Sequence, residues 1–525
     1  MLLCFSVLFF RQTLGVSVRV RVLVAVLAMF GLTGVSYAQG VLLKNVVIYD
    51  GSGKAGVRGD VRIQGDKIVE VGDKLTAKTG ETVRDEHGLA LAPGFIDMHS
   101  HADGNILEDL DAENSTRQGL TTVVVGQDGE SEYPLADFLG KLEKTPPALN
   151  VASMVGHGTI RHLAMDPKNQ IREATPEEIA KMKKLLAEEL EAGPFGLSSG
   201  LEYDPGHFAT TAEVIDLAKM AGEQGGFYIS HVRDEGNHVF DSYDEIIKIG
   251  KGGKLPVEIT HIKMGVPAMW NMAAKRMPEV FAQARKEGVD LKADVYPYTF
   301  WQSNLRVIML DRDYYNPEKV AKALEESGGA DHMWFTSYKP DPTIVGKSLE
   351  EVAKMWKMTP VETYMKMVRA ADVGVGGNAE NEPSIMAQSM NEDDVRWLVA
   401  QPNIMFCSDG GLRDRHPRGA GSFPRVLGKY VRDDKVLPLE LAIHKMTEMP
   451  AQQLGLKDRG RIAPGFVADM VVFDPATVAD GSTMQTPQAP PKGIEAVWVS
   501  GEIVVENNKV TGAHPGKVLR HMPTN

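Results

Sequence analysis

The sequence predicts an α/β fold: a (β/α)8 TIM-type barrel with a small β-sandwich domain built from both termini. Three observations favour this fold. Eight apolar runs that end in polar residues alternate with helical patterns through the middle of the chain. Alternating apolar and polar residues mark short strands at both ends. The 525 residues, 43% of them hydrophobic, allow one large core and a smaller domain.

The first 38 residues differ from the rest of the chain. They contain no acidic residue and three arginines, followed by an apolar run over 22–35 and by the small residues Ser36 and Ala38. This pattern is typical of a secretory signal peptide cut after Ala38. The apolar run is shorter than the ~20 residues of a membrane-spanning helix. We therefore expect a periplasmic or secreted protein with no stable membrane insertion after cleavage; an uncleaved anchor is the alternative.

The predicted β-sandwich combines residues 39–92 with residues 462–525. The first segment contains VLLKNVVIYDG and DVRIQGDKIVEVG, and the second contains ADMVVFDP and AVWVSGEIVVENNKV. In each of these stretches apolar and polar residues alternate, with glycine-containing turns between them. Because the two segments flank a different pattern, they predict one discontinuous domain.

Residues 93–461 carry the barrel pattern. A strand is expected at each apolar run: 94–97, 121–125, 151–155, 195–199, 227–230, 257–260, 290–294 and 404–408. Helical segments lie between the runs; one example, 175–193, opens on the capping residue Thr175 and closes on Gly193. The long gap before the last run predicts an insertion near 312–395, close to the mouth of the active site.

Charge and cysteine content exclude some classes of protein. The net charge is −13, which argues against nucleic-acid binding, because such proteins usually present a basic face. The only cysteines are Cys4 and Cys407, and Cys4 leaves with the predicted signal peptide. The mature chain then has no internal disulfide. No pattern indicates an oligomeric state.

The residues that carry chemistry follow the apolar runs. Residues i and i+2 of a strand point the same way, so His99 and His101 leave one strand side by side, as a metal site requires. Active sites of barrels lie at the carboxyl ends of the strands. There the sequence also places Asp128, His231, His261 and Asp409. These six residues are the candidate metal ligands.

This set of residues indicates metal-assisted hydrolysis at a carbonyl. Imidazoles hold a divalent cation without cancelling its charge, and a carboxylate can bridge two ions. The metal lowers the pKa of its bound water towards ~7. Asp409 suits the role of general base and acid, which takes a proton from water and returns it to a leaving amine. Imidazole suits zinc, iron, nickel and copper, so the spacing alone does not name the ion.

Several segments together resemble the D-aminoacylases, which are N-acyl-D-amino-acid deacylases of the amidohydrolase superfamily. The resemblance covers essentially all of residues 41–515, and the segment HPRGAGSFPRVLGKYVRD is the part specific to this family. The others, in chain order, are PGFIDMHSHAD, SSGLEYDPG, SHVRDEG, THIK, DVYPY, CSDG and KMTEMPAQQLGLKDRGRIAPGFVADMVVFDP.

The resemblance implies a zinc-dependent enzyme that cleaves N-acyl-D-amino acids to a carboxylate and a free D-amino acid. His231 and His261 would hold the tighter ion, and His99 and His101 the weaker one. The small-molecule substrate would bind through its carboxylate at Lys263, Tyr296 and Arg418. Arginine pairs well with carboxylates because it can donate two parallel hydrogen bonds. Tyr203 is a further candidate for the pocket wall.

One position departs from the family pattern. D-aminoacylases carry Asn-Cys-Gly after the second barrel strand, where this chain has Gln127-Asp128-Gly129. Aspartate is an oxygen ligand and can bridge two ions, but it is harder than a thiolate. The number and type of metal ions are therefore open at this point. So is the alternative that Asp128 only forms a turn before Gly129.

Two other functions are alternatives. A dipeptide or cyclic-amide hydrolase of the same superfamily would carry a bridging lysine at the fourth strand, where this chain has Leu197-Ser198-Ser199. A non-catalytic barrel-fold binding protein would have lost metal ligands, yet the four histidines and Asp409 are present. Both alternatives are therefore disfavoured.

Overall fold

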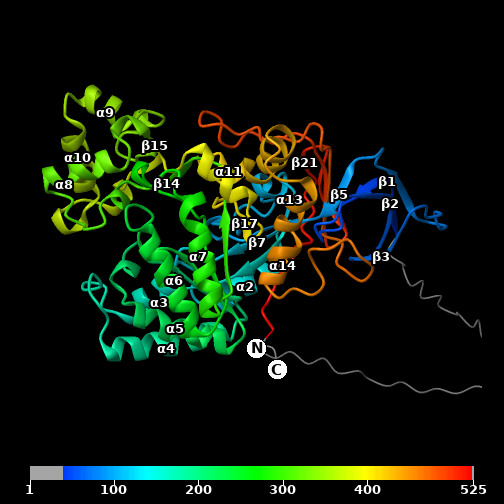
Figure 1. The fold of residues 1–525 in the computed structure, drawn as a ribbon, viewed down its shortest axis with the longest axis horizontal. Helices are drawn as coiled ribbons and strands as arrows, with labels where there is room; N and C mark the ends of the chain where they lie inside the picture. The colour runs from blue at the N-terminus through cyan, green and yellow to red at the C-terminus, as the bar shows by residue number, and fades with distance from the viewer. Residues whose placement is uncertain (1–39, 523–525) are drawn as a thin grey trace, which may run out of the picture. The chain divides into compact units, whose positions relative to one another are not determined.

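The computed structural model describes residues 40–522 (Figure 1). The predicted signal peptide, residues 1–38, lies outside these residues. Among the described residues, no helix has the length and apolar character needed to cross a membrane.

The two terminal segments form one nine-stranded sheet. Its order is β21-β20-β19-β18-β5-β1-β2-β3, with β4 paired to β1. The segments meet where β5 pairs antiparallel with β18, with Ala92 opposite Val471. In Figure 1 the blue N-terminal strands accordingly lie beside the red C-terminal ones. The strands are β1 (Val41–Ile48), β2 (Val57–Gln64), β3 (Lys67–Gly72), β4 (Thr82–Asp85), β5 (Ala90–Pro93), β18 (Met470–Phe473), β19 (Ile494–Val499), β20 (Glu502–Glu506) and β21 (Lys509–Val510).

The middle of the chain contributes parallel strands, and each of the eight predicted runs contains one. They form two sheets, β6-β7-β8 and β17-β13-β12-β11-β10-β9. Only Met154 separates β8 from β9, so the third predicted run is divided between the two sheets. At the opposite edges of the two sheets, a parallel bridge joins Ser100, which follows β6, to Gly410, which follows β17. The strands are β6 (Phe95–Asp97), β7 (Leu120–Val125), β8 (Asn150–Ser153), β9 (Val155–Gly156), β10 (Gly196–Gly200), β11 (Phe227–His231), β12 (Val257–Ile259), β13 (Leu291–Val295) and β17 (Ile404–Phe406).

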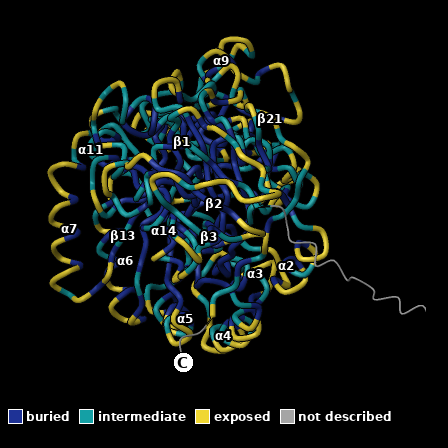
Figure 2. The backbone as a smooth tube through the Cα atoms, turned by 90° about the vertical axis from the view of Figure 1, so that its right-hand side faces the viewer, coloured by how far each residue is buried: buried dark blue, intermediate teal, exposed yellow. Residues whose placement is uncertain are grey.

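Amphipathic helices cover these strands. The helix predicted after Thr175 is confirmed as α4, and Thr175 and Glu178 form the reciprocal hydrogen bonds of a capping box. Helix α7 buries Met277, Phe281 and their neighbours on one face, and Figure 2 shows exposed residues on its other side. The helices are α1 (Glu113–Thr116), α2 (Leu135–Lys144), α3 (His157–Ala164), α4 (Pro176–Leu190), α5 (Thr211–Glu223), α6 (Val239–Gly253), α7 (Ala273–Glu287), α11 (Glu392–Ala400), α12 (Arg418–Arg425), α13 (Leu439–Met446) and α14 (Glu448–Gln453).

A separate unit lies between β13 and α11. Its antiparallel sheet has the order β14-β16-β15. It has its own hydrophobic core, which includes Phe335, Tyr364 and Ile385. The sheet begins at Phe300, earlier than the predicted range 312–395, because the chain directly after β13 pairs with β16. The elements are β14 (Phe300–Asn304), α8 (Pro317–Glu326), β15 (Met333–Ser337), α9 (Leu349–Trp356), α10 (Pro360–Ala371) and β16 (Ser384–Gln388).

Candidate active site and metal centre

His99 and His101 follow β6, and their imidazoles face the same point. Their Nε2 atoms are 3.2 Å apart. The other ring nitrogen of His99, Nδ1, lies against the hydroxyl of Thr260, which fixes the orientation of the ring. His99 is fully buried, whereas His101 is partly exposed. The sequence prediction that these two side chains leave one strand together is confirmed.

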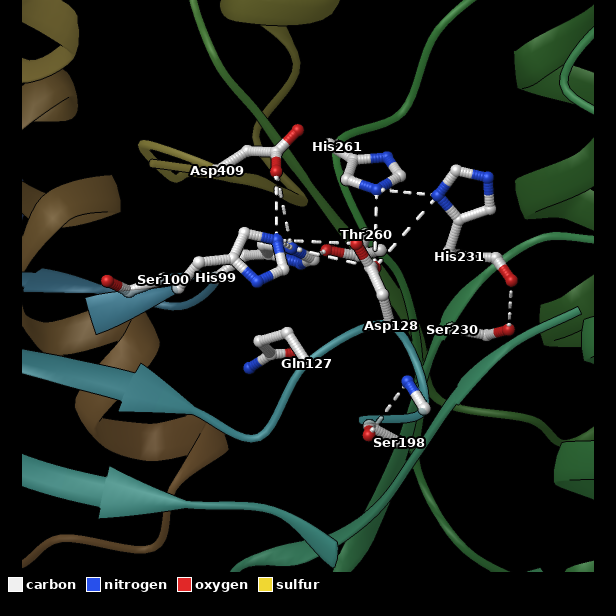
Figure 3. Close-up of polar contacts among 12 residues, drawn as sticks. His99, Ser100, Gln127, Asp128, Ser198, Ser230, His231, Thr260, His261 and Asp409 are labelled. Carbon is white, nitrogen blue, oxygen red and sulfur yellow. Dashed lines mark hydrogen bonds and ion pairs between the residues drawn. The ribbon is translucent and has the colours of Figure 1, made fainter. Parts of the chain in front are cut away.

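Asp128 lies at the centre of the histidines (Figure 3). Its Oδ1 is 3.6 Å from His99 Nε2, 3.4 Å from His261 Nε2 and 4.0 Å from His231 Nδ1. Its Oδ2 is 3.4 Å from His101 Nε2. Oδ1 is buried and has no hydrogen-bond partner among the described residues. The carboxylate of Asp128 therefore faces all four imidazoles, in addition to the turn that its backbone forms before Gly129.

Two acidic side chains orient the second pair of histidines. His231 Nδ1 and His261 Nε2 face each other at 3.0 Å. On the far side of the rings, Glu202 accepts a hydrogen bond from His231 Nε2 at 2.7 Å, and Glu235 lies 3.2 Å from His261 Nδ1. Carboxylates in this position set which ring nitrogen is free to bind a metal.

Asp409 completes the cluster from the end of β17. Its Oδ1 lies 3.5 Å from His99 Nε2 and 3.3 Å from His101 Nε2. Its Oδ2 accepts a hydrogen bond from Arg418, the first residue of α12. Burial would raise the pKa of Asp409, but Arg418 and His261 outweigh that effect and hold it below its ordinary value. Asp409 is therefore ionised at neutral pH.

The predicted carboxylate-binding residues lie beside this cluster. The charged groups of Lys263 and Arg418 are 5.7 and 4.9 Å from the centre of the Tyr296 ring. Burial raises the pKa of Tyr296 to about 12, and its hydroxyl has no hydrogen-bond partner among the described residues. The Tyr203 ring lies 4.5 Å from that of His231. The structure thus brings all ten predicted site residues together.

A cavity of about 1170 Å³ opens onto eight of these ten residues; His99 and Tyr296 lie buried behind its wall. The loops after β7, β10, β11 and β12 line one side, and residues 301–312 with parts of α8 and α10 line the other. The separate unit between β13 and α11 therefore supplies part of the wall around the reacting groups.

Comparison with known proteins identifies the family. The sequence profile of the amidohydrolase family matches residues 82–328 and 320–505. The D-aminoacylase of Alcaligenes xylosoxydans xylosoxydans is 36% identical over 506 residues, covering 91% of this chain and 97% of that protein. This chain belongs to the D-aminoacylase family of the amidohydrolases. The family assignment made from the sequence is confirmed.

Solved structures of this family have the same fold, an amidohydrolase fold of TIM-barrel type with an extra domain. A D-aminoacylase whose binuclear metal centre was studied has a TM-score of 0.81 and 33% identity, covering 92% of this chain and 100% of that one. The N-acyl-D-glutamate deacylase of Bordetella bronchiseptica has a TM-score of 0.81 and 32% identity, covering 91% and 99%. That structure holds zinc and a phosphonate that mimics the tetrahedral intermediate of the reaction.

The donor atoms of this chain fit a metal centre. Four potential ligand atoms of His99, Asp128, His261 and Asp409 lie within 4.8 Å of one another, and so do those of His231, Glu235 and His261. Two nitrogen ligands at about 2.0–2.1 Å from a tetrahedral zinc are roughly 3.3 Å apart, close to the spacings here. The unpartnered Oδ1 of Asp128 lies where the two groups meet. The carboxylate of Asp128 therefore lies where it could bind an ion in either group.

Sequence reasoning missed three residues that hold the ligands in place: Glu202, Glu235 and Thr260. All three lie in segments that resemble the family, SSGLEYDPG, SHVRDEG and THIK. Their roles depend on contacts across neighbouring strands, since Thr260 reaches His99 and Glu202 reaches His231. No spacing within the sequence reveals such pairs.

Proposed function

We propose that this protein hydrolyses the amide bond of N-acyl-D-amino acids, releasing a carboxylate and a free D-amino acid. The observation that carries the proposal is the convergence of four histidines and two aspartates beside a lysine–tyrosine–arginine group. The first set suits a metal centre, and the second suits a substrate carboxylate. The relatives named above are a D-aminoacylase and an N-acyl-D-glutamate deacylase.

In this proposal each residue has one task. His99, His101, Asp128, His231 and His261 hold zinc, as one or two ions, with Asp409 beside them. Zinc held by these residues would supply an activated water and polarise the carbonyl. Asp409 accepts a proton from the attacking water and donates it to the leaving amine. Lys263, Tyr296 and Arg418 hold the α-carboxylate, and Tyr203 lines the pocket.

The structure favours a linear amide over a cyclic one. The strand β10 reads Gly-Leu-Ser-Ser-Gly and has no lysine to bridge two ions. Ser199 instead bonds the hydroxyl of Ser230 at 2.8 Å. The groups that bind a carboxylate also suit an open-chain product with a free amino and carboxyl end.

Domain organisation and location are part of the proposal. The parallel strands β6 to β13 and β17 would form one closed (β/α)8 barrel over 93–461, which the bridge between Ser100 and Gly410 supports. The nine-stranded sheet would be the sandwich domain of 39–92 and 462–525. Residues 1–38 would direct export to the periplasm or medium. Sequencing the mature N-terminus tests this, and an intact Met1 would contradict it.

The activity is tested with paired N-acetyl-D and N-acetyl-L amino acids and protein of known metal content. Free amine is expected from the D series only. Asp409→Asn should lower kcat by at least about 10²-fold, because general acid–base catalysis contributes that much, while zinc stays bound. Asp216→Asn serves as the control and should keep full activity, because Asp216 pairs with Lys183 and does not line the cavity. Amine release from neither series, or an active Asp409→Asn variant, would overturn the proposal.

A further inference from the structure

His416 lies in the loop between β17 and α12, and it does not line the cavity. The residue is buried, and both of its ring nitrogens form hydrogen bonds. Nδ1 accepts a hydrogen bond at 3.0 Å from the backbone N–H of Arg418, and Nε2 donates one at 3.0 Å to the carbonyl of Phe300. The ring therefore links the first residue of α12 to the first residue of β14, which is distant in the sequence.

These two bonds determine the protonation state of His416. A carbonyl oxygen can only accept a hydrogen bond, so Nε2 must carry a proton. A backbone N–H can only donate, so Nδ1 must be unprotonated. Burial and the charge of Arg418 lower the pKa of His416 well below its ordinary value, which agrees with a neutral ring. The surroundings thus admit one tautomer of His416 in one orientation.

Two tyrosine rings hold His416 from the side. The ring centres of Tyr296 and Tyr298 lie 6.1 and 5.8 Å from that of His416, in edge-to-face arrangements. The guanidinium of Arg418 lies 4.9 Å from the centre of the same Tyr296 ring. His416 therefore contacts Arg418 at the backbone and packs against the ring on which the Arg418 side chain lies.

The start of α12 depends on His416. Pro417, the N-cap residue of this helix, makes no side-chain cap bond, and His416 supplies the acceptor for the Arg418 N–H. Within residues 40–522 the guanidinium of Arg418 donates hydrogen bonds only to Asp409, and its Nε has no partner. The ion pair with Asp409 therefore leaves donor groups of Arg418 unused, because a guanidinium has five N–H groups. With a single side-chain anchor, the orientation of Arg418 relies on a fixed backbone.

The Phe300 carbonyl connects the same imidazole to the separate unit between β13 and α11. The strand β14 begins at Phe300, and the next three residues, 301–303, line the cavity. Arg418 lines the same cavity. His416 is therefore a buried link between the proposed carboxylate-binding arginine and the outer wall of the cavity.

We propose that His416 is a positioning residue for substrate binding: its Nδ1 fixes Arg418 for the substrate α-carboxylate, and its Nε2 holds β14 beside α12. The proposal rests on the deacylase function proposed above and gives a task to a side chain outside the cavity. Loss of the Nδ1 bond should weaken the binding of carboxylate substrates selectively, because Arg418 is the group that this bond holds.

Two substitutions separate the two hydrogen bonds. In His416→Gln the side-chain amide can replace Nε2 as the donor to Phe300, but it cannot replace Nδ1 as the acceptor for Arg418; His416→Asn does the reverse. In His416→Gln, KM for N-acetyl-D-methionine should rise about fivefold to tenfold, as expected for the loss of one buried hydrogen bond. In His416→Asn this KM should stay close to that of the wild type. Metal content should be the same in all three proteins.

A competitor without the carboxylate distinguishes positioning from a general loss of structure. N-acetyl-D-methioninamide has the same acyl group and side chain as N-acetyl-D-methionine, and its inhibition constant should be equal in the wild type and in both variants. His444→Gln is the matched control, because His444 bonds the carbonyl of Gly51 and does not line the cavity. It should change neither constant.

The outcomes separate this proposal from the proposed function. A wild-type KM for N-acetyl-D-methionine in His416→Gln, or an equal weakening of acid and amide, would overturn the role of His416 alone. If His416→Gln does not fold, His416→Asn decides: an unchanged KM supports the role, and a selective rise in KM overturns it. A wild-type protein that hydrolyses no N-acyl-D-amino acid would overturn the proposed function itself.

Discussion

Three of the charged site residues have strained backbones. His261, Asp128 and Asp409 have φ angles of 34°, 55° and 50°, in the left-handed region that non-glycine residues rarely adopt. Each follows a parallel strand, where the chain must turn away while the side chain points inward. Such strain persists only where the surrounding structure imposes it, and it is common at functional sites. The geometry of the ligands is therefore imposed by the strands behind them.

Lys445 in α13 carries an ionisable group at a fully buried position. Its side chain is fully buried, donates to the carbonyl of Val399 and lies 4.7 Å from the centre of the Phe406 ring. No ion pair with Lys445 occurs within residues 40–522. Burial lowers its pKa from 10.5 to about 7.

We predict that Lys445→Met stabilises the protein at neutral pH. Between pH 7 and 10.5 the unfolded chain binds a proton at Lys445 that the native state does not. The buried Lys445 therefore destabilises the native state by its full amount below pH 7, and this destabilisation disappears as the pH rises towards 10.5. At pH 7 the gain should reach a few kcal/mol, at ~1.4 kcal/mol per pKa unit.

Urea unfolding at pH 7 and pH 9.5 measures this effect. The stability difference between Lys445→Met and wild type should be smaller at pH 9.5. Lys251→Met, at an exposed surface ion pair, should show no such trend. If the stability difference between Lys445→Met and wild type is the same at both pH values, Lys445 is not a neutral buried lysine.

At the scale of elements, the end of β10 fixes the loop that carries Asp128. A Cβ added to Gly200 would lie 2.1 Å from the carbonyl oxygen of Asp128. Gly129, with φ +79°, is equally restricted, since its added Cβ would lie 2.7 Å from the Gly200 nitrogen. The two backbones pass so closely that only glycine fits between them. Packing between neighbouring loops thus sets the position of the central carboxylate.

Gly200→Ala should therefore displace Asp128 and weaken metal binding, by about 10–100-fold if it acts as other changes around ligands do. Metal content after dialysis, measured by plasma mass spectrometry, checks this expectation. Gly140→Ala is the control, because Gly140 lies in α2 with open space around it. It should gain about 1 kcal/mol of stability from helix propensity and keep its metal. Full metal content in Gly200→Ala would contradict the prediction.

At the scale of the whole molecule, the described chain has more than one hydrophobic core. The largest extends through the parallel strands and their helices, and a distinct one fills the unit between β13 and α11. The metal ligands all come from the first region, whereas the outer wall of the cavity comes from the second. The candidate metal ligands and part of the cavity wall thus come from regions with different hydrophobic cores.

Phe335→Ala should loosen this separate unit and leave the metal centre intact. Phe335 is buried in β15, and its loss should cost about 3–5 kcal/mol. Hydrogen exchange should rise within residues 300–388, KM should increase, and metal content should stay constant. Met355→Ala, at an exposed position of α9, should change none of these. Faster exchange in the parallel strands would show that the two regions unfold together.

The sequence by itself predicted the parallel strands and the positions of the candidate metal ligands at their ends. Each of the eight apolar runs contains a parallel strand, and His99, His101, His231, His261 and Asp409 lie at or directly after strand ends. This succeeds because strand burial and side-chain alternation are local properties of the chain. The family resemblance added Lys263, Tyr296 and Arg418, which the structure places beside the cluster.

Only the tertiary structure decided which groups share a partner. It placed Asp128 among all four imidazoles, put Glu202, Glu235 and Thr260 behind them, and neutralised Arg306 with Glu382, 76 residues away. It also began the separate unit at Phe300, because β14 pairs with a strand more than eighty residues later. Long-range pairing depends on how strands and loops pack in space. A single sequence, read without an alignment of its relatives, contains no local signal for such pairs.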